Sequence, residues 1–172
     1  MNTLCPKCGK DNTSTFVDTK LKTHGFFCED CKKDFGVDDG TALKKKEEDL
    51  LSFTYDRSHD GEKKTFRLVR DAGKATLTIE TEKDKKRDVY EPIDFTPYVD
   101  SFLSLLFEKL FVLDWPETTN GFLVGKDPDT CTLTLLFKDK SSVRKSGFVR
   151  LPVYSKALDE ILDSLLSSTK EE

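Results

Sequence analysis

The feature that most constrains this chain is a set of four cysteines arranged as two C-x-x-C pairs near its beginning. Cys5 and Cys8 form the first pair, Cys28 and Cys31 form the second, and nineteen residues separate the two pairs. A C-x-x-C turn places two thiolates on one side of a tight loop, and two such turns complete the tetrahedral shell that Zn²⁺ prefers. The spacing therefore predicts one structural Zn²⁺ ion, with iron as the alternative metal.

The residues around these pairs resemble those of the zinc-ribbon family, in which two cysteine turns lie at the ends of β-hairpins. The resemblance covers about residues 3–36. Gly9 fits the first turn because glycine adopts positive φ at no steric cost, whereas Lys32 stands where ribbons often have glycine. Because four sulfur ligands leave no open coordination position, the resemblance implies a structural ion rather than a catalytic one.

The segment 1–36 has few apolar residues with which to fold. The expected members of its very small core are Phe16, Val17, Leu21, Phe26, Phe27 and Phe35. The metal is therefore expected to provide much of the folding free energy of this segment.

The rest of the chain reads as a charged linker over residues 37–49 and an α+β domain over residues 50–172. Short alternating runs predict half-buried strands of an antiparallel sheet at 51–55, 66–68, 77–79 and 133–137. Helical periodicity predicts one helix from Thr96 to about Leu113 and a second from Ser155 into the C-terminal tail. The fold class expected from this pattern is α+β, with a small zinc ribbon beside an antiparallel sheet and two helices.

An internal repeat appears when residues 64–113 are placed on residues 120–168 at a constant offset of 56. The shift places Phe66 on Phe122, Leu77 on Leu133 and Tyr98 on Tyr154. We interpret it as a tandem β-β-β-α duplication, with chance similarity between amphipathic segments as the alternative. The duplication predicts a free sheet face from which Thr76, Thr78, Thr132 and Thr134 project.

Charge and composition give few hints about a partner. The chain has 28 basic and 32 acidic residues, a net charge of −4, so a general affinity for nucleic acid or for an anionic membrane is not expected. The stretch Val99–Leu113 is too short and too polar to span a membrane, and no signal peptide opens the chain. We therefore expect a cytoplasmic protein whose cysteines stay reduced.

Catalytic motifs are scarce. The two histidines, His24 and His59, give little material for acid–base catalysis, and no nucleophile elbow, phosphate-binding loop or dinucleotide fingerprint is present. The chain is therefore not expected to be an enzyme, and no small-molecule substrate is inferred. Cys131 reads as a buried strand thiol, and the role of Trp115 stays open.

Three functions remain in order of preference. The first is a zinc-binding regulatory or adaptor protein that binds another protein. The second is a nucleic-acid-binding protein that uses Lys20, Lys22 and His24 for phosphate contacts and Phe26 for stacking. The third is an enzyme with an unrecognised site. The segment 127–166 resembles a recurring module of uncharacterised bacterial proteins, and this resemblance implies no function.

Overall fold

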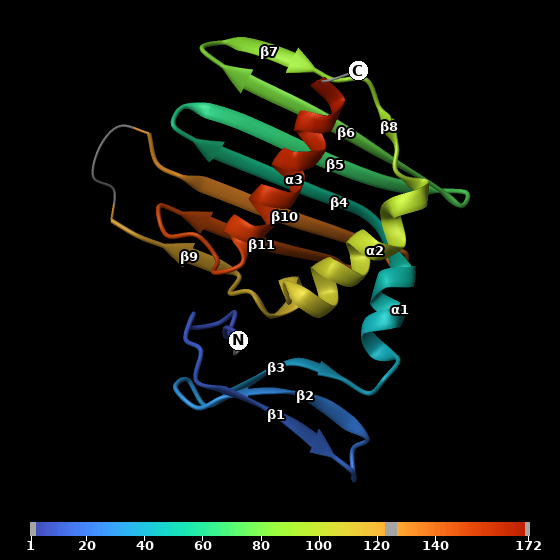
Figure 1. Cartoon of the computed structure of the whole chain (residues 1–172), viewed down its shortest axis with the longest axis vertical. Helices are drawn as coiled ribbons and strands as arrows, with labels where there is room; N and C mark the ends of the chain where they lie inside the picture. The colour runs from blue at the N-terminus through green and yellow to red at the C-terminus, as the bar shows by residue number, and fades with distance from the viewer. Residues whose placement is uncertain (1–2, 123–126, 171–172) are drawn as a thin grey trace.

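This computed structural model describes residues 3–122 and 127–170. Its strands form two sheets, and apolar and polar side chains alternate along the strands of the larger one. The chain is a mixed α+β protein, as its sequence predicts, and most of its helical residues lie beside the larger sheet (Figure 1). The elements in chain order are β1 (Thr13–Asp18), β2 (Thr23–Cys28), β3 (Lys33–Asp38), α1 (Ala42–Asp49), β4 (Leu50–His59), β5 (Glu62–Asp71), β6 (Lys74–Lys83), β7 (Lys86–Val89), β8 (Ile93–Asp94), η1 (Thr96–Tyr98), α2 (Val99–Ser104), η2 (Leu105–Lys109), η3 (Val112–Asp114), β9 (Thr118–Asn120), β10 (Thr130–Phe137), β11 (Ser142–Phe148) and α3 (Ser155–Lys170).

The larger sheet has the strand order β7-β6-β5-β4-β10-β11-β9, with β8 beside β6. Its described strand pairs are antiparallel except for β9 and β11, which run parallel. Along β10, Cys131, Leu133 and Leu135 are buried, whereas Thr132 and Thr134 point to the opposite face and are partly exposed. This period of two assigns one face of the sheet to the core.

The helices α2 and α3 cover the core face of this sheet (Figure 1). Leu106 of η2 and Leu158 and Leu162 of α3 are fully buried with strand residues such as Phe53 and Leu133. Trp115 belongs to the same core, and its indole Nε1 donates a hydrogen bond of 2.7 Å to the carbonyl of Leu110. Trp115, whose role the sequence left open, thus packs in the core.

We call residues 50–170 the sheet domain.

The helix expected from Thr96 to Leu113 is interrupted. It begins as the 3₁₀ turn η1, continues as α2 and widens into the π-helix η2, where the amide of Leu110 bonds the carbonyl of Leu105. Phe111 then adopts the left-handed conformation with φ 50°, which ends the helix. A bulky residue in this conformation is uncommon, so the surrounding structure must hold it there.

The linker expected over residues 37–49 is largely regular structure. Residues 37 and 38 complete β3, and residues 42–49 form α1. Asp39 starts this helix because its Oδ1 accepts hydrogen bonds of 2.8 Å from the amides of Thr41 and Ala42. The run of lysines and acids is therefore a short helix, with Glu47 buried, and not an open linker.

The pseudo-two-fold arrangement expected from the repeat is wrong. In the first segment β5, β6 and β7 are neighbours in chain order, whereas in the second segment β9 lies beside β11 instead of β10. Burial differs as well, because Phe66 is 1% exposed and Phe122 is 96% exposed. Leu77 and Leu133 do match, at 1% and 0%, since any two central strands over one core share that alternation.

Candidate metal centre

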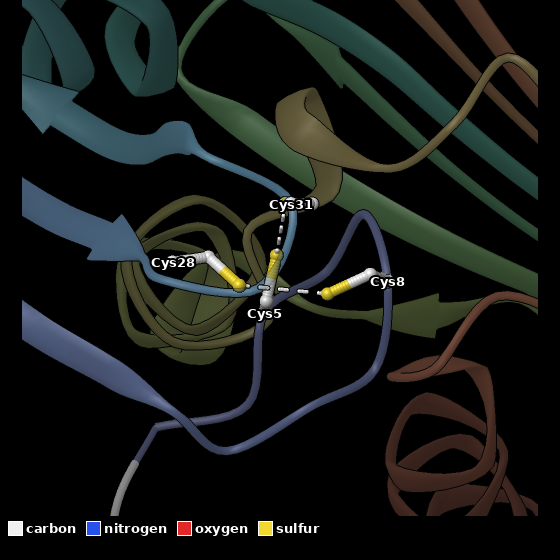
Figure 2. A group of neighbouring side chains, drawn as sticks. All are labelled: Cys5, Cys8, Cys28 and Cys31. Carbon is white, nitrogen blue, oxygen red and sulfur yellow. Dashed lines mark hydrogen bonds between the residues drawn. The ribbon is translucent and has the colours of Figure 1, made fainter.

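The strands β1, β2 and β3 form a separate three-stranded antiparallel sheet (Figure 1). The four predicted cysteine ligands come together at the end of this sheet where Cys28 pairs with Thr13 and Lys33. Their sulfur atoms lie within 4.8 Å of one another, and their side chains converge on a common point (Figure 2). The Sγ atoms of Cys5 and Cys31 are 3.7 Å apart, and those of Cys8 and Cys28 are 3.5 Å apart. These four cysteines could hold a metal ion.

The donor set can be tested against zinc. A tetrahedral Zn²⁺ with Zn–S bonds of about 2.3 Å places its sulfur atoms about 3.8 Å apart. The observed separations of 3.7 and 3.5 Å are close to this sulfur–sulfur distance. They are far longer than the ~2.05 Å of a disulfide bond. The residues therefore fit a single tetrahedral ion with sulfur ligands.

Backbone amides prepare part of this site for negative charge. Amides of Cys31 and Asp30 bond the Cys28 sulfur, and they lower the pKa of the Cys28 thiol to about 7. Burial has the opposite effect on Cys5 and Cys31 and raises the pKa of both thiols, that of Cys31 to about 12. These raised pKa values favour the protonated thiols of Cys5 and Cys31. A bound cation would be needed to bring all four to thiolate.

Each of the two cysteine turns is followed by a residue in the left-handed conformation, although the sequences of the turns differ. Gly9 follows the first pair with φ 79°, and Lys32 occupies the equivalent place after the second pair with φ 54°. Lys32 therefore adopts the left-handed conformation that glycine would adopt without strain. At this residue the second turn, whose geometry the sequence left uncertain, has a positive φ like the first.

The buried cluster beside the cysteines is shared between two parts of the chain. We call residues 3–38 the cysteine module. From its own residues the described cluster takes Cys5, Cys28 and Phe35, and its fourth buried member is Phe111 of the sheet domain. The Phe111 ring lies 5.2 Å from Phe35 and 5.5 Å from Phe26, edge-on to both. An aromatic ring from elsewhere thus completes the core of the module.

Polar contacts also join the cysteine module to the sheet domain, along the interface around Phe111 that we call the seam. The amide of Gly36 donates a 2.8 Å hydrogen bond to Asp114 Oδ2, and the Tyr154 hydroxyl donates a 2.7 Å bond to the carbonyl of Leu4. Lys7 Nζ lies 3.9 Å from Asp114 Oδ1. The polar segment 37–49 suggests few contacts between the two parts, but these bonds and the Phe111 contact join them.

The residues considered for nucleic-acid contact are not assembled as expected. Lys20 and Lys22 lie in the turn between β1 and β2, while His24 and Phe26 lie on β2. Lys20, Lys22 and His24 are exposed, but Phe26 stacks on Phe35 at 5.2 Å and is not a free stacking surface. The small core predicted for the module is also smaller than expected, because Val17 and Leu21 are 76% and 71% exposed.

Sequence reasoning missed the sheet-domain residues that complete the site: Phe111, Asp114 and Tyr154. The sequence Leu113-Asp114-Trp115-Pro116 indicates a turn after a helix, but no local pattern says which surface that turn meets.

A second polar cluster, under α3, was also missed. Asp159 accepts a 2.8 Å hydrogen bond from the Tyr55 hydroxyl and a 2.7 Å bond from Arg57 Nε, which fixes this helix to β4.

Fold and site together define an α+β protein in which four cysteines that could hold a metal ion lie in a small module packed against the sheet domain. No family model, curated protein or solved structure matches the chain. In the part of the chain that the structure describes, no helix has the length and apolar character that a membrane crossing requires.

Proposed function

We propose that this protein is a cytoplasmic zinc-binding adaptor or regulatory protein that recognises another protein. The four cysteines would hold one structural Zn²⁺, and four thiolates on one ion leave no coordination position for a substrate. The observation that carries the binding role is the helix-free face of the eight-stranded sheet. Both long helical segments pack on the other face, so this one is available to a partner.

The chemistry of the helix-free face favours a protein partner. Arg67, Thr54, Thr134 and Arg144 lie in one row across four adjacent strands. Acidic side chains follow in the next row, where Asp56 pairs in register with Thr65 and Thr65 with Glu80. The face thus mixes both signs of charge with threonines. Mixed polar surfaces of this kind are typical of transient protein interfaces, whereas phosphate binding requires a positive surplus.

Partly exposed apolar side chains interrupt the polar rows. Val69, Leu136 and Phe148 lie on the same face and are 42%, 39% and 40% exposed. Their spacing provides several small apolar contacts within a polar surface, which is the composition of a non-obligate interface. Thr76, Thr78, Thr132 and Thr134 also lie on this face, because they alternate with the buried residues of β6 and β10 and not because of a duplication.

The metal part of the proposal is tested by elemental analysis. The purified chain should contain one zinc per molecule and be colourless, because Zn²⁺ is a d¹⁰ ion. A red protein that contains iron would leave the four ligands in place but remove zinc.

The partner is tested by affinity capture from cells that express the protein, with and without nuclease. Capture should resist nuclease and be lost in the charge reversals Arg67→Glu and Arg144→Glu on the helix-free face. Lys156→Glu on the exposed side of α3 is the matched control and should capture normally. Equal capture by all three variants would show that the partner uses a different surface.

Nucleic-acid binding through the cysteine module is the second candidate. It is favoured by Lys20, Lys22 and His24, which are exposed and form no ion pair among the described residues. Capture that nuclease abolishes, and that Lys20→Glu with Lys22→Glu also abolishes, would support this candidate over the adaptor role.

A further inference from the structure

One buried carboxyl oxygen, Oε1 of Glu47, has no hydrogen-bond partner in the described part of the chain. Glu47 lies on α1, and its side chain is 7% exposed. Leaving a buried polar atom unpaired costs about 1–3 kcal/mol, and more if the group is charged. A native structure rarely leaves such an atom unsatisfied, so the environment of Glu47 must supply a partner.

The neighbour of Glu47 across the helix packing is another acid. The helix α1 packs against η2, and the Glu108 carboxyl of η2 is close enough for its charge to raise the pKa of Glu47. Glu108 itself is exposed to solvent and accepts a hydrogen bond from Ser104 Oγ. Ionised carboxylates only accept hydrogen bonds, so two of them in contact repel each other and leave Glu47 Oε1 unsatisfied.

The other charges that surround Glu47 do not resolve this conflict. On α1, Lys44 Nζ is 3.9 Å from Oε2 of Glu47, and it is largely exposed. On α2, Asp100 adds negative potential. On β5, the Arg70 guanidinium donates hydrogen bonds to the carbonyls of Glu47 and Leu50, at 2.7 and 3.1 Å, and not to the carboxyl. Burial and then Glu108 raise the pKa of Glu47 above its ordinary value of 4.5, against a smaller lowering by Lys44.

We propose that Glu47 carries a proton in the folded protein and donates it to the Glu108 carboxylate, which fastens α1 to η2 by a pH-sensitive hydrogen bond. The buried acid keeps the proton, and the exposed one keeps the charge. A divalent cation between them is disfavoured, because the Lys44 ammonium lies 3.9 Å from Oε2 of Glu47 and would repel such an ion.

The position of this bond gives it a structural consequence. α1 connects β3 of the cysteine module to β4 of the sheet domain, and η2 leads to Phe111, which fills the core of that module. Loss of the proton would place two repelling carboxylates where these two segments meet. The seam is therefore held more firmly in mild acid than in alkali, independently of the partner that the protein binds.

The sign of the effect follows from proton linkage. Because the folded state has the raised pKa, it binds the proton more tightly than the unfolded state does. The contribution to stability is complete below the ordinary value of 4.5 and is lost as pH rises through the folded-state value. Stability should therefore decrease with rising pH in this window.

Glu47→Gln tests the proposal, because the amide can donate to Glu108 without titrating. Urea unfolding of the full, metal-loaded chain is compared between pH 5.5 and 8.5. We expect the urea midpoint of Glu47→Gln to rise relative to wild type as pH rises. Glu48→Gln removes the same charge from an exposed neighbour and should show a constant difference. Titration of the cysteine ligands is common to all three proteins and cancels.

Identical pH profiles for Glu47→Gln and Glu48→Gln would overturn the proposal. Stabilisation of wild type but not of Glu47→Gln by millimolar calcium would also overturn it, because a cation would then be the missing partner. If Glu47→Gln fails to fold, the titration midpoint of the Glu47 carboxyl in the wild-type protein, measured by ¹³C NMR, tests the proposal instead. A Glu47 midpoint inside or above the range from pH 5.5 to 8.5 supports the proton, and a midpoint below that range removes it.

Discussion

The cysteine module and the sheet domain bury their interiors by different means. In the sheet domain, strands such as β4, β5 and β10 supply alternating apolar side chains that two helical segments cover. In the module, the described buried cluster draws only Cys5, Cys28 and Phe35 from its own residues and needs Phe111 from outside. The larger part can be stabilised by apolar burial, whereas the smaller part has few apolar residues of its own, includes the Phe111 ring of the sheet domain in its cluster and is expected to need a metal ion.

This difference indicates that the folding of the cysteine module depends on the sheet domain more than the folding of the sheet domain depends on the module. Removing the module would expose one face of Phe111 and break the bonds from Gly36 and Tyr154, but would leave the sheet core intact. Removing the sheet domain would take away a buried member of the module's small cluster. The module should therefore lose its structure first under any destabilising condition.

The largest effect expected from a single change is that of Cys28→Ser. Loss of one sulfur ligand should remove most of the roughly 10–16 kcal/mol of apparent metal-binding free energy that small zinc domains use to fold. Hydrogen exchange should then show that residues 3–38 lose protection and that the segment from Phe111 to Trp115 loses part of its protection. The strands β5 and β6 should keep theirs.

The matched control is Cys131→Ser, which changes the buried cysteine of β10 and leaves the metal ligands untouched. This variant should retain one metal per chain. If the two parts of Cys28→Ser lost protection together, the stability of the sheet domain would also depend on the metal, and the one-way dependence would be wrong.

Phe111→Ala should have the next largest effect. The change empties a site that is 4% exposed and removes the ring contacts to Phe26, Phe35 and Tyr154. Truncation of a buried phenylalanine costs about 3–5 kcal/mol. Metal release and Trp115 fluorescence, followed together in urea, should both move to lower urea concentration, with the larger shift in metal release.

Phe148→Ala provides the control for this truncation, since Phe148 is 40% exposed on the helix-free face. Its effect should stay within about 0.5 kcal/mol. A loss of stability in Phe111→Ala that appeared only in Trp115 fluorescence would mean that the ring stabilises the sheet domain and not the module.

Local patterns in the sequence predicted what depends on local chemistry. The spacing of Cys5, Cys8, Cys28 and Cys31 predicted their convergence, because each C-x-x-C turn is a short-range structure. Alternation predicted the core side of β4, β5, β6 and β10, and helical periodicity predicted α3 from Ser155. These elements all follow from the sequence periods of two and 3.6 residues.

What the sequence could not predict depends on contacts between distant segments. The left-handed conformation of Phe111 is imposed by its surroundings and has no propensity signal. The place of β9 beside β11 also lacks a signal, because a strand of three residues carries too little alternation to compete with an apparent repeat. The charged sequence of α1 concealed a helix whose first amides, of Ala42 and Leu43, donate to Asp39 and Asp38.

Lys32→Gly should produce the smallest effect, and it has the opposite sign. Lys32 is held at φ 54°, a conformation that costs a residue with a side chain about 1–2 kcal/mol more than it costs glycine. Glycine should relieve this strain in the second cysteine turn. It also removes the exposed ion pair between Lys32 and Glu29, at 2.7 Å, which is worth at most about 1 kcal/mol.

Comparison with Lys32→Ala separates these two contributions, because alanine loses the ion pair but keeps the strain. Zinc affinity, measured by competition with a chromophoric chelator, should be about fivefold higher in Lys32→Gly than in Lys32→Ala, which corresponds to about 1 kcal/mol. The sheet domain should not respond to either change, because Lys32 is exposed and lies away from the Phe111 seam. Equal affinities in the two variants would mean that the left-handed conformation of Lys32 causes no strain in the second turn. Glycine, which stands at the equivalent position of the first turn, would then give no gain in stability there.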